Sequence, residues 1–463
     1  MDIKERIQSI LTKHWLLLPL FITTTFGFGY QTIPLFTWLY IPTILSYNRN
    51  QQDYQTIFFT YLVSSIGFSL GYLGNFNTVS INDKGPRFPL FWVVILCSFA
   101  IHLLLVVALF AEKFTIQRYQ GHKRAHLIRI VFFPCLWTSI WCLMTRYGPL
   151  GDFISLSTSL VIWPEFGQIA SIGGRSLLDF LMVLFGTILV EFIFPTKEEK
   201  NEDQEEEEEE ETIPSSGRRR LAVLSSILMA LILVYGGARV NIHSNSFYQV
   251  NYPDYVPKTE QVGCVVGPGG SDSPQLQTQQ DIWLNMTREL AESGAKLVLW
   301  SELTAFVNDL EEEKILIGKA KDLARTYQIY LGISYGTVNQ NKLVFITKQG
   351  EIGFDFNKAH PVPGIETQPA GPNVLQYIDT EEFGRIGGAI CFDFNFPSFI
   401  SQASTHNIDI MLQPSWTWGP TGTYHEQTNI IRAVENGFTL FRCVSQGVSG
   451  IYEPTLNGIF NQK

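Results

Sequence analysis

The sequence predicts a multi-pass α-helical membrane domain followed by an α/β domain. Two observations lead to this prediction. Apolar stretches fill much of the first half of the 463-residue chain, and several reach the roughly 20 residues that a bilayer crossing needs. From about residue 252 onward, short β-branched runs alternate with helical stretches instead. A chain of this length and uneven composition is expected to form more than one core.

The apolar stretches predict seven membrane crossings. Residues 14–48 contain no Asp, Glu, Lys or Arg, and at about 1.5 Å per residue they exceed one crossing. Gly27, Gly29 and Pro34 therefore predict a tight turn between two short helices. The remaining spans are expected at residues 57–73, 88–110, 128–144, 176–194 and 221–237. Residues 1–196 thus form a membrane domain of about six helices, and a seventh helix follows.

Charges in the loops predict the orientation of these spans, because cytoplasmic loops carry an excess of Lys and Arg. The N-terminal tail, residues 112–126 and residues 218–220 are basic, and counting crossings puts all three on one side. The domain at 250–463 is then expected on the extracytoplasmic or lumenal side. The sequence does not identify the membrane.

The acidic balance of the chain comes from one segment. Residues 197–211 hold eleven acidic residues and two lysines, a charge of −9 out of the net −10. We expect 197–220 to be a disordered cytosolic loop, since such blocks of charge stay solvated. The absence of a basic patch interleaved with aromatics argues against nucleic-acid binding. Six scattered cysteines argue against a disulfide scaffold.

The second half has the alternating pattern of an α/β domain. Its length of about 200 residues suffices for a sizeable core. Helices are expected at 279–293 and 311–327. Strands are expected at 261–266, 296–300, 329–334, 342–347, 385–390 and 408–412.

Three polar residues stand out in this domain. Glu302 and Cys391 follow expected strands, where functional groups gather in α/β sheets, and Lys358 lies between them in the chain. A carboxylate can deprotonate a thiol, while an ammonium lowers the thiol pKa and stabilises an oxyanion. Each residue alone also fits a structural role: a core cysteine, a charge at a helix N-terminus, or a solvated lysine. Spacing alone gives only a weak hypothesis.

The motifs around these residues resemble those of the nitrilase (carbon–nitrogen hydrolase) superfamily. They are Trp300-Ser-Glu302, Lys358-x-His-Pro-x-Pro and Gly387-Gly-x-Ile-Cys391-Phe-Asp. This resemblance implies an αββα sandwich with a Glu-Lys-Cys triad. The spans ahead of it, with Phe26-Gly-Phe-Gly-Tyr30 and Gln168-Ile-Ala-Ser-Ile-Gly-Gly174, resemble the membrane half of the apolipoprotein N-acyltransferase family.

The resemblance implies a role for each motif residue. Glu302 is the general base, Lys358 stabilises the oxyanion together with a backbone N–H near Phe392, and Cys391 is the acylated nucleophile. Glu366 matches a further acid, and Asp393 stands where the family carries a Glu. Trp416 and Trp418 match a loop beside the site, although interfacial anchoring or plain packing explains them equally well.

Other residues receive supporting roles. Arg432, Glu435 and Asn436 match a helix behind the site. His360 and His425 are expected to be structural or to support the site from behind rather than to be catalytic, and Cys264 and Cys443 are expected to pack in the core. The family also carries further strands and an eighth span after the segment matching 447–457, whereas this sequence ends at Lys463.

The resemblance implies an acyltransferase that moves an acyl chain from a phospholipid to an amine, such as that of a lipoprotein, through a cysteine thioester. One alternative is a membrane-tethered amidase or nitrilase. Another is a non-enzymatic membrane protein or transporter, which the scarcity of charges in the spans, Asp179 excepted, argues against. No metal or organic cofactor is expected, because zinc-site, P-loop and dinucleotide-binding spacings are absent from the sequence.

Overall fold

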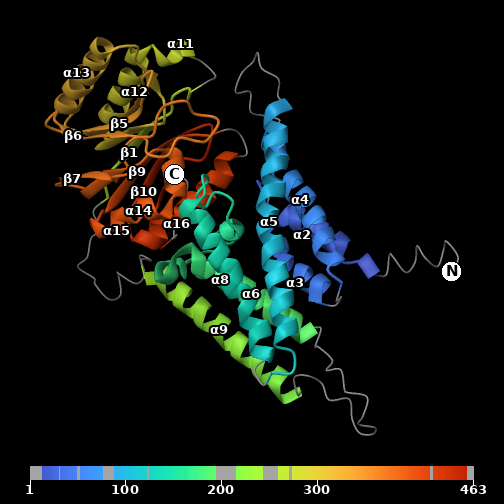
Figure 1. Cartoon of the computed structure of the whole chain (residues 1–463). Coiled ribbons are helices and arrows are strands. Elements are labelled where there is room, and N and C mark those ends of the chain that lie inside the picture. The colour runs from blue at the N-terminus through green and yellow to red at the C-terminus, as the bar shows by residue number, and fades with distance from the viewer. Residues whose placement is uncertain are drawn as a thin grey trace, which may run out of the picture.

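The computed structural model describes residues 13–30, 32–49, 53–76, 88–122, 125–161, 163–193, 215–242, 259–270, 274–417 and 421–455. Within these ranges, long helices form the first half and a mixed α/β domain forms the second (Figure 1), which confirms the predicted fold class. The acidic segment 197–211 and Trp418 lie outside the described residues. The domain boundaries and the count of seven crossings stay predictions.

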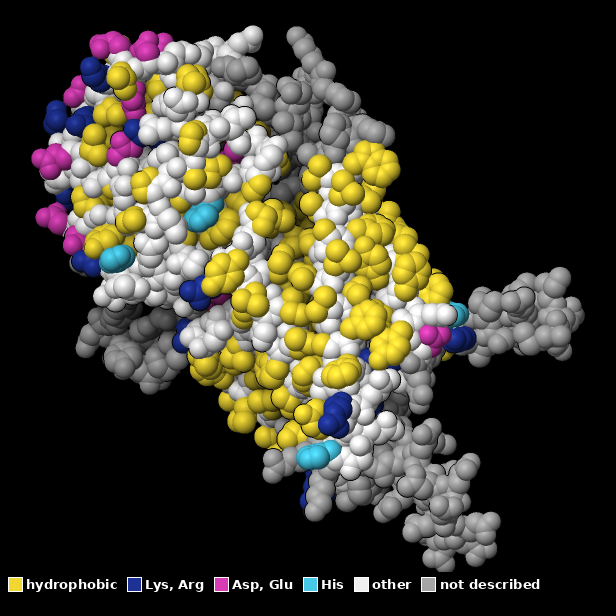
Figure 2. Space-filling view, viewed as in Figure 1, with side chains coloured by type: hydrophobic (Ala, Val, Ile, Leu, Met, Phe, Trp, Pro, Cys, Tyr) yellow, Lys and Arg dark blue, Asp and Glu magenta, His cyan; other side chains and the backbone are white. Residues whose placement is uncertain are grey.

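Helices occupy each predicted span of the membrane domain. Among the described residues, five of them are long and apolar enough to cross a membrane: the main parts of α4, α5, α6, α8 and α9. The helices are α2 (Leu17–Gly27), α3 (Pro34–Arg49), α4 (Gln55–Phe76), α5 (Phe88–Arg118), α6 (Ala125–Tyr147), α8 (Ala170–Ile193) and α9 (Ser215–Ile242). Hydrophobic side chains cover their exposed face, whereas Lys, Arg, Asp and Glu gather on the other domain (Figure 2). This distribution is that of a membrane protein.

A tight turn joins α2 to α3, where glycines were expected to allow one. Gly29 has a φ of 88°, which lies in the left-handed region that glycine adopts without strain. The Tyr30 N–H donates to the carbonyl of Gly71 on α4 at 3.3 Å, so the turn packs closely against a third helix. A Cβ atom at Gly29 would collide with the backbone of Gly71.

Buried charges join four membrane helices. Arg49 of α3 contacts Glu112 of α5 at 2.5 Å and Glu191 of α8 at 2.7 Å, and Arg129 of α6 reaches Glu191 at 3.0 Å. The expectation that the spans lack buried charges is therefore wrong, because Arg129 and Glu191 lie inside expected spans, while Arg49 and Glu112 lie just past the ends of theirs. Two cations and two anions neutralise one another here, which is how intramembrane charges are usually accommodated.

Two β-sheets form the centre of the second domain. One has the strand order β1-β2-β4-β5-β6, with β3 (Ala305–Phe306) paired to β4, and the other has the order β11-β10-β9-β8-β7. The first contains β1 (Val262–Val265), β2 (Leu297–Trp300), β4 (Tyr330–Gly336), β5 (Asn341–Ile346) and β6 (Ile352–Asn357). The second contains β7 (Gln376–Thr380), β8 (Gly384–Gly388), β9 (Ile410–Trp416), β10 (Thr439–Ser445) and β11 (Gly450–Tyr452).

Helices cover the outer face of each sheet and complete an αββα sandwich. Helices α12 (Gln280–Glu292) and α13 (Leu310–Tyr327) pack on the first sheet, and α16 (Thr421–Asn436) packs on the second (Figure 1). On its other side α16 contacts α8 of the membrane domain. A single cluster of buried side chains runs from the space between the sheets into the membrane helices. The two domains therefore share a core.

A disulfide joins Cys264 of β1 to Cys443 of β10. The expectation that both cysteines are merely packed in the core is therefore wrong. Their sequence separation of 179 residues hid the pairing, because only the stacking of the two sheets brings these strands together. The bridge fastens one sheet to the other.

Candidate active site

The carboxyl ends of several strands bring the predicted triad to one edge of the sandwich. Glu302 lies two residues past β2, Lys358 directly follows β6, and Cys391 lies three residues past β8. Strand β5 is antiparallel to both β4 and β6, so β6 ends at the same edge as β2 and β4. This topology explains how residues almost 90 positions apart share one site.

Glu302 and Lys358 form a fully buried ion pair. The Lys358 Nζ lies 2.7 Å from Glu302 Oε1 and 2.6 Å from Glu366 Oε1. Asn341 at the start of β5 also donates to Glu302 Oε1 at 2.8 Å, and the Trp416 N–H donates to Glu302 Oε2 at 2.8 Å. Three donors thus fix the Glu302 carboxylate in one orientation.

Electrostatics keep Lys358 charged. Burial by itself lowers the pKa of Lys358, but Glu302 and Glu366 outweigh it and hold that pKa well above its usual value. Burial and the nearby Glu302 raise the pKa of Glu366, against the opposing effect of Lys358. Two carboxylates therefore share one buried ammonium.

Cys391 is held in a strained turn. It begins the 3₁₀ helix η2 (Cys391–Asn395), and its φ of 47° lies in the left-handed region that non-glycine residues rarely adopt. The buried Sγ donates to the Trp416 carbonyl at 3.5 Å. Because the Trp416 backbone contacts both Cys391 and Glu302, this one residue links the two side chains.

The resting state of Cys391 is a thiol. Burial and the negative charge of Glu302 raise its pKa to about 12, and the opposing influence of Lys358 is smaller. The sequence-based expectation of a lowered thiol pKa is therefore wrong in sign, because it counted the ammonium and left out desolvation. A thiol in this state needs a base at the moment of attack.

Asp393 closes the turn behind Cys391. Its Oδ1 accepts the His360 N–H at 2.7 Å and lies 3.0 Å from His360 Nδ1, and its Oδ2 accepts the Ile390 N–H at 2.9 Å. The His360 ring stacks on Phe396 with a centroid distance of 3.9 Å. The Asp393 carboxylate thus joins the segment after Lys358 to the turn that carries Cys391.

An apolar cavity of about 250 Å³ opens at Cys391. The soluble domain contributes Glu366, Cys391, Phe392, Trp416 and His425, while α4 and α5 contribute Phe68, Tyr72, Val94, Cys97 and Ile101. Phe153, from the segment between α6 and α8, packs against Phe392 with a centroid distance of 6.1 Å. Helices α4 and α5 therefore form part of the wall around Cys391.

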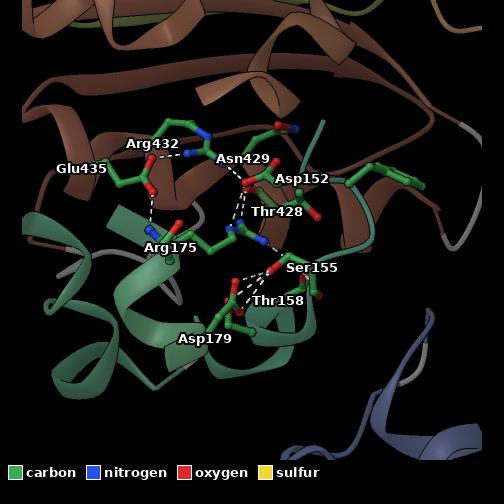
Figure 3. A network of polar contacts seen from close by, with 12 residues as sticks. Asp152, Ser155, Thr158, Arg175, Asp179, Thr428, Asn429, Arg432 and Glu435 are labelled. Atoms are coloured by element: carbon green, nitrogen blue, oxygen red, sulfur yellow. Dashed lines mark hydrogen bonds and ion pairs between the residues drawn. The ribbon is translucent and has the colours of Figure 1, made fainter. Parts of the chain in front are cut away.

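A buried polar network, the junction network, fastens the membrane domain to α16 (Figure 3). Its charged members are Asp152, Arg175, Asp179, Arg432 and Glu435. The backbone N–H of Arg175 on α8 donates to the Glu435 carboxylate at 2.7 Å. The Arg175 guanidinium donates to the Thr428 carbonyl at 2.6 Å. Arg432 contacts Asp152 and Glu435.

The junction network also reaches the nucleophile turn. Arg432 Nε donates to the Phe394 carbonyl at 3.0 Å, and the Asp152 N–H donates to the Asn395 carbonyl at 2.8 Å. Gly174 has a φ of 65°, and this kink turns the Arg175 N–H toward Glu435. The Asp179 carboxylate accepts a hydrogen bond from the Ser155 hydroxyl at 3.3 Å. Asp179, the charged residue within a span that the transporter alternative singled out, therefore belongs to the junction network.

Two residues at the site escaped the sequence analysis. Asn341 belongs to no motif. It lies at the start of an antiparallel strand, and the sequence analysis searched for functional residues only after the carboxyl ends of strands. His425 was expected to be structural or to support the site from behind, but it lines the cavity together with Cys391. The spacing of His425 and Arg432 along one helix face was the available signal, since residues seven apart share a face.

Comparisons with known proteins agree with this architecture. Residues 265–459 match the carbon–nitrogen hydrolase family, and residues 21–188 match the apolipoprotein N-acyltransferase N-terminal domain. The fold, the buried Glu-Lys-Cys cluster and these matches define a membrane protein of the nitrilase superfamily. More particularly, the pairing of these two parts resembles that of apolipoprotein N-acyltransferases, as the sequence motifs predicted.

Individual relatives are distant. Apolipoprotein N-acyltransferase of Rickettsia bellii is 23% identical over 267 residues, and that of Rickettsia typhi is 23% identical over 259 residues. Each alignment covers 50% of this chain and 50% of the relative, so the chain spans about half the length of these curated relatives in the match. An amidase from Nesterenkonia sp. is 19% identical with a TM-score of 0.36, over 43% of this chain and 85% of that chain.

Proposed function

We propose that this protein is a membrane-embedded N-acyltransferase that moves an acyl chain from a phospholipid to an amine through a thioester on Cys391. The observation that supports this proposal best is the cavity, in which helices α4 and α5 line the space beside the nucleophile. A lipid acyl chain can enter such a site laterally from the bilayer. Each buried methylene would contribute about 0.8 kcal/mol to binding.

The first half-reaction forms the thioester. Glu302 takes the proton of Cys391, and the thiolate attacks the carbonyl carbon of the phospholipid ester. Lys358 and a backbone N–H near Phe392 stabilise the tetrahedral oxyanion. The ester C–O bond then breaks, and Glu302 returns the proton to the departing alkoxide, which leaves as a lysophospholipid.

The second half-reaction transfers the acyl group. An amine, such as the N-terminal amine of a lipoprotein, attacks the thioester carbonyl and passes a proton to Glu302. The C–S bond breaks, and the proton returns to the Cys391 thiolate. Glu366 keeps the Lys358 ammonium in place through its 2.6 Å contact. Asp393 holds the turn, while Trp416 flanks the entering substrate.

Covalent trapping tests the proposal. Purified protein in detergent is incubated with a phospholipid that carries an alkyne in its acyl chain. We expect a gel-stable label on the wild type that hydroxylamine removes, and no label on Cys391→Ala. Cys97→Ala is the matched control, because Cys97 is a second free thiol that lines the same cavity. The Cys97→Ala variant should still be labelled.

The outcomes separate the candidate activities. If the folded wild-type protein acquires no label, the proposal that a phospholipid is the acyl donor is contradicted. Label that decays equally in buffer and in the presence of an amine-bearing lipopeptide points to a hydrolase instead. Decay that requires the lipopeptide, with acyl product recovered on its amine, supports transfer.

We further propose that the catalytic domain lies on the extracytoplasmic or lumenal side. The basic segments support this orientation. The Cys264–Cys443 disulfide supports it independently, because disulfides persist in oxidising compartments and are rare in the cytosol.

The disulfide gives a direct test of the orientation. Protein from native membranes, alkylated during lysis and digested without reductant, should yield one cross-linked peptide pair holding Cys264 and Cys443. Cys135, which is a free thiol, should be alkylated in the same sample after the membranes are solubilised. Recovery of Cys264 and Cys443 as alkylated thiols would contradict an oxidising location.

A further inference from the structure

His425 is a buried histidine that the proposed reaction does not use. It lies on α16 with 2% of its surface exposed and lines the cavity together with Cys391 and Phe392. Its ring lies 6.3 Å, centroid to centroid, from that of Phe153, which lines the same cavity. The two ring nitrogens of His425 have different surroundings, and this difference determines what the side chain can do.

Arg442 determines the tautomer of His425. Its Nη2 lies 3.2 Å from His425 Nδ1. A guanidinium has only donors, so Nδ1 must be the acceptor and the ring proton must reside on Nε2. Burial and the positive charges of Arg442 and Lys358 hold the pKa of His425 well below its usual range, so the ring stays neutral with one N–H.

The Nε2–H group has no hydrogen-bond partner among the described residues, although it is buried. An unsatisfied buried donor destabilises the site, and the rest of the cavity wall is mostly apolar. An oxygen of a bound ligand would satisfy this donor. The same wall holds the nucleophile, so that ligand is the molecule on which Cys391 acts.

We infer that His425 is a substrate-binding residue that donates a hydrogen bond from Nε2 to an oxygen of the acyl donor. The inference rests on the proposed function, since it takes the ligand to be a phospholipid. Ester and phosphate oxygens share the required acceptor chemistry. Arg442 is then a positioning residue, because it fixes the tautomer without touching the ligand.

Two substitutions separate this role from a structural one. In His425→Gln the side-chain amide extends to the position of Nε2 and keeps a donor there. In His425→Asn the shorter amide lies at the position of Nδ1, so it keeps an acceptor for Arg442 and loses the donor. The rate of thioester formation is measured against the concentration of the alkyne phospholipid for both variants.

We expect His425→Asn to lower kcat/KM for thioester formation about 10- to 100-fold, and His425→Gln to stay within about threefold of wild type. The opposite order would show that only the contact with Arg442 matters and would overturn the inference. Two variants equal to wild type would also overturn it. A wild type that forms no thioester counts against the proposed function instead.

A second substrate identifies the acceptor oxygen. Alkyne diacylglycerol has the ester but lacks the phosphate. If the His425→Asn defect persists with diacylglycerol, the acceptor is an ester oxygen; if the defect appears only with phospholipid, the acceptor is a phosphate oxygen.

A measurement without a His425 variant covers the case in which neither variant folds. Cys391→Ala protein labelled with ¹⁵N-histidine binds phospholipid without turnover. In this protein the resonance of the His425 Nε2 proton should move downfield on lipid addition. An unchanged resonance at saturating lipid would overturn the inference.

Discussion

Glu302→Gln is expected to lower the rate of thioester formation at pH 7 by about 10²- to 10⁴-fold, the range that a positioned general base contributes. The pKa of the Cys391 thiol is raised to about 12, so almost no thiolate exists before the base acts. Glutamine keeps the shape of Glu302 and can still accept from Asn341 or Lys358, but it cannot take a proton. The rate of alkyne labelling measures the loss.

The pH dependence of the same variant tests the reason for the loss. Without a base, only thiol that has ionised by itself can react, and below its pKa this fraction rises about tenfold per pH unit. Removing Glu302 also removes a charge that raises the thiol pKa, but burial still raises it. The labelling rate of Glu302→Gln should therefore climb steadily from pH 6 to 9, and the wild-type rate should climb less steeply.

Glu313→Gln is the matched control. Glu313 is also paired with a lysine, Lys342 at 2.9 Å, but it lies on α13, away from the cavity. Its variant should keep the wild-type rate and pH profile. If the Glu302→Gln protein is labelled at the wild-type rate, Glu302 is not the general base.

Arg432→Met is expected to destabilise the protein by about 3–5 kcal/mol, as is usual when one partner of a buried ion pair is lost. The junction network has three carboxylates and two guanidiniums by formal charge, and the substitution leaves three carboxylates facing one guanidinium. It also removes the donor to the Phe394 carbonyl in the nucleophile turn. Thermal melting in detergent measures the first effect, and thioester labelling measures the second.

Two further variants test the charge argument. Asp152→Asn leaves two carboxylates and two guanidiniums, so its loss of stability should be smaller than that of Arg432→Met. Asp379→Asn removes the partner of Arg385 in a solvent-exposed ion pair and should cost at most about 1 kcal/mol. Equal melting temperatures for Arg432→Met and Asp379→Asn would contradict a structural role for the junction network.

The sequence predicted most elements whose burial is uniform. The fully buried runs that became β2, β4 and β5 were expected, as were the apolar spans. The strands that escaped mix polar with apolar residues. Strand β7 is half exposed at a sheet edge, and β10 contains Arg442, which is fully buried because it interacts with His425 and the Val448 carbonyl. A tertiary contact of this kind leaves no periodic pattern in the chain.

The features of the candidate site also fall into two groups, those that the sequence predicts and those that it does not. Glu302, Lys358 and Cys391 belong to motifs in continuous sequence, so resemblance singled them out. The sign of the Cys391 pKa shift depends on desolvation, which spacing does not reveal. Asn341, the junction network and the tautomer of His425 depend on which elements meet in three dimensions.

The disulfide between β1 and β10 also constrains the order in which the protein can be completed. Cys264 is made 179 residues before its partner, so it must remain a thiol while almost the whole catalytic domain is synthesised. No earlier thiol in that stretch is its native partner, although Cys391 becomes available first. Correct bridging therefore requires that the two sheets stack before oxidation, which protects the nucleophile from being captured by Cys264. Formation of the bridge thus marks a domain whose two sheets have stacked while Cys391 is still a free thiol.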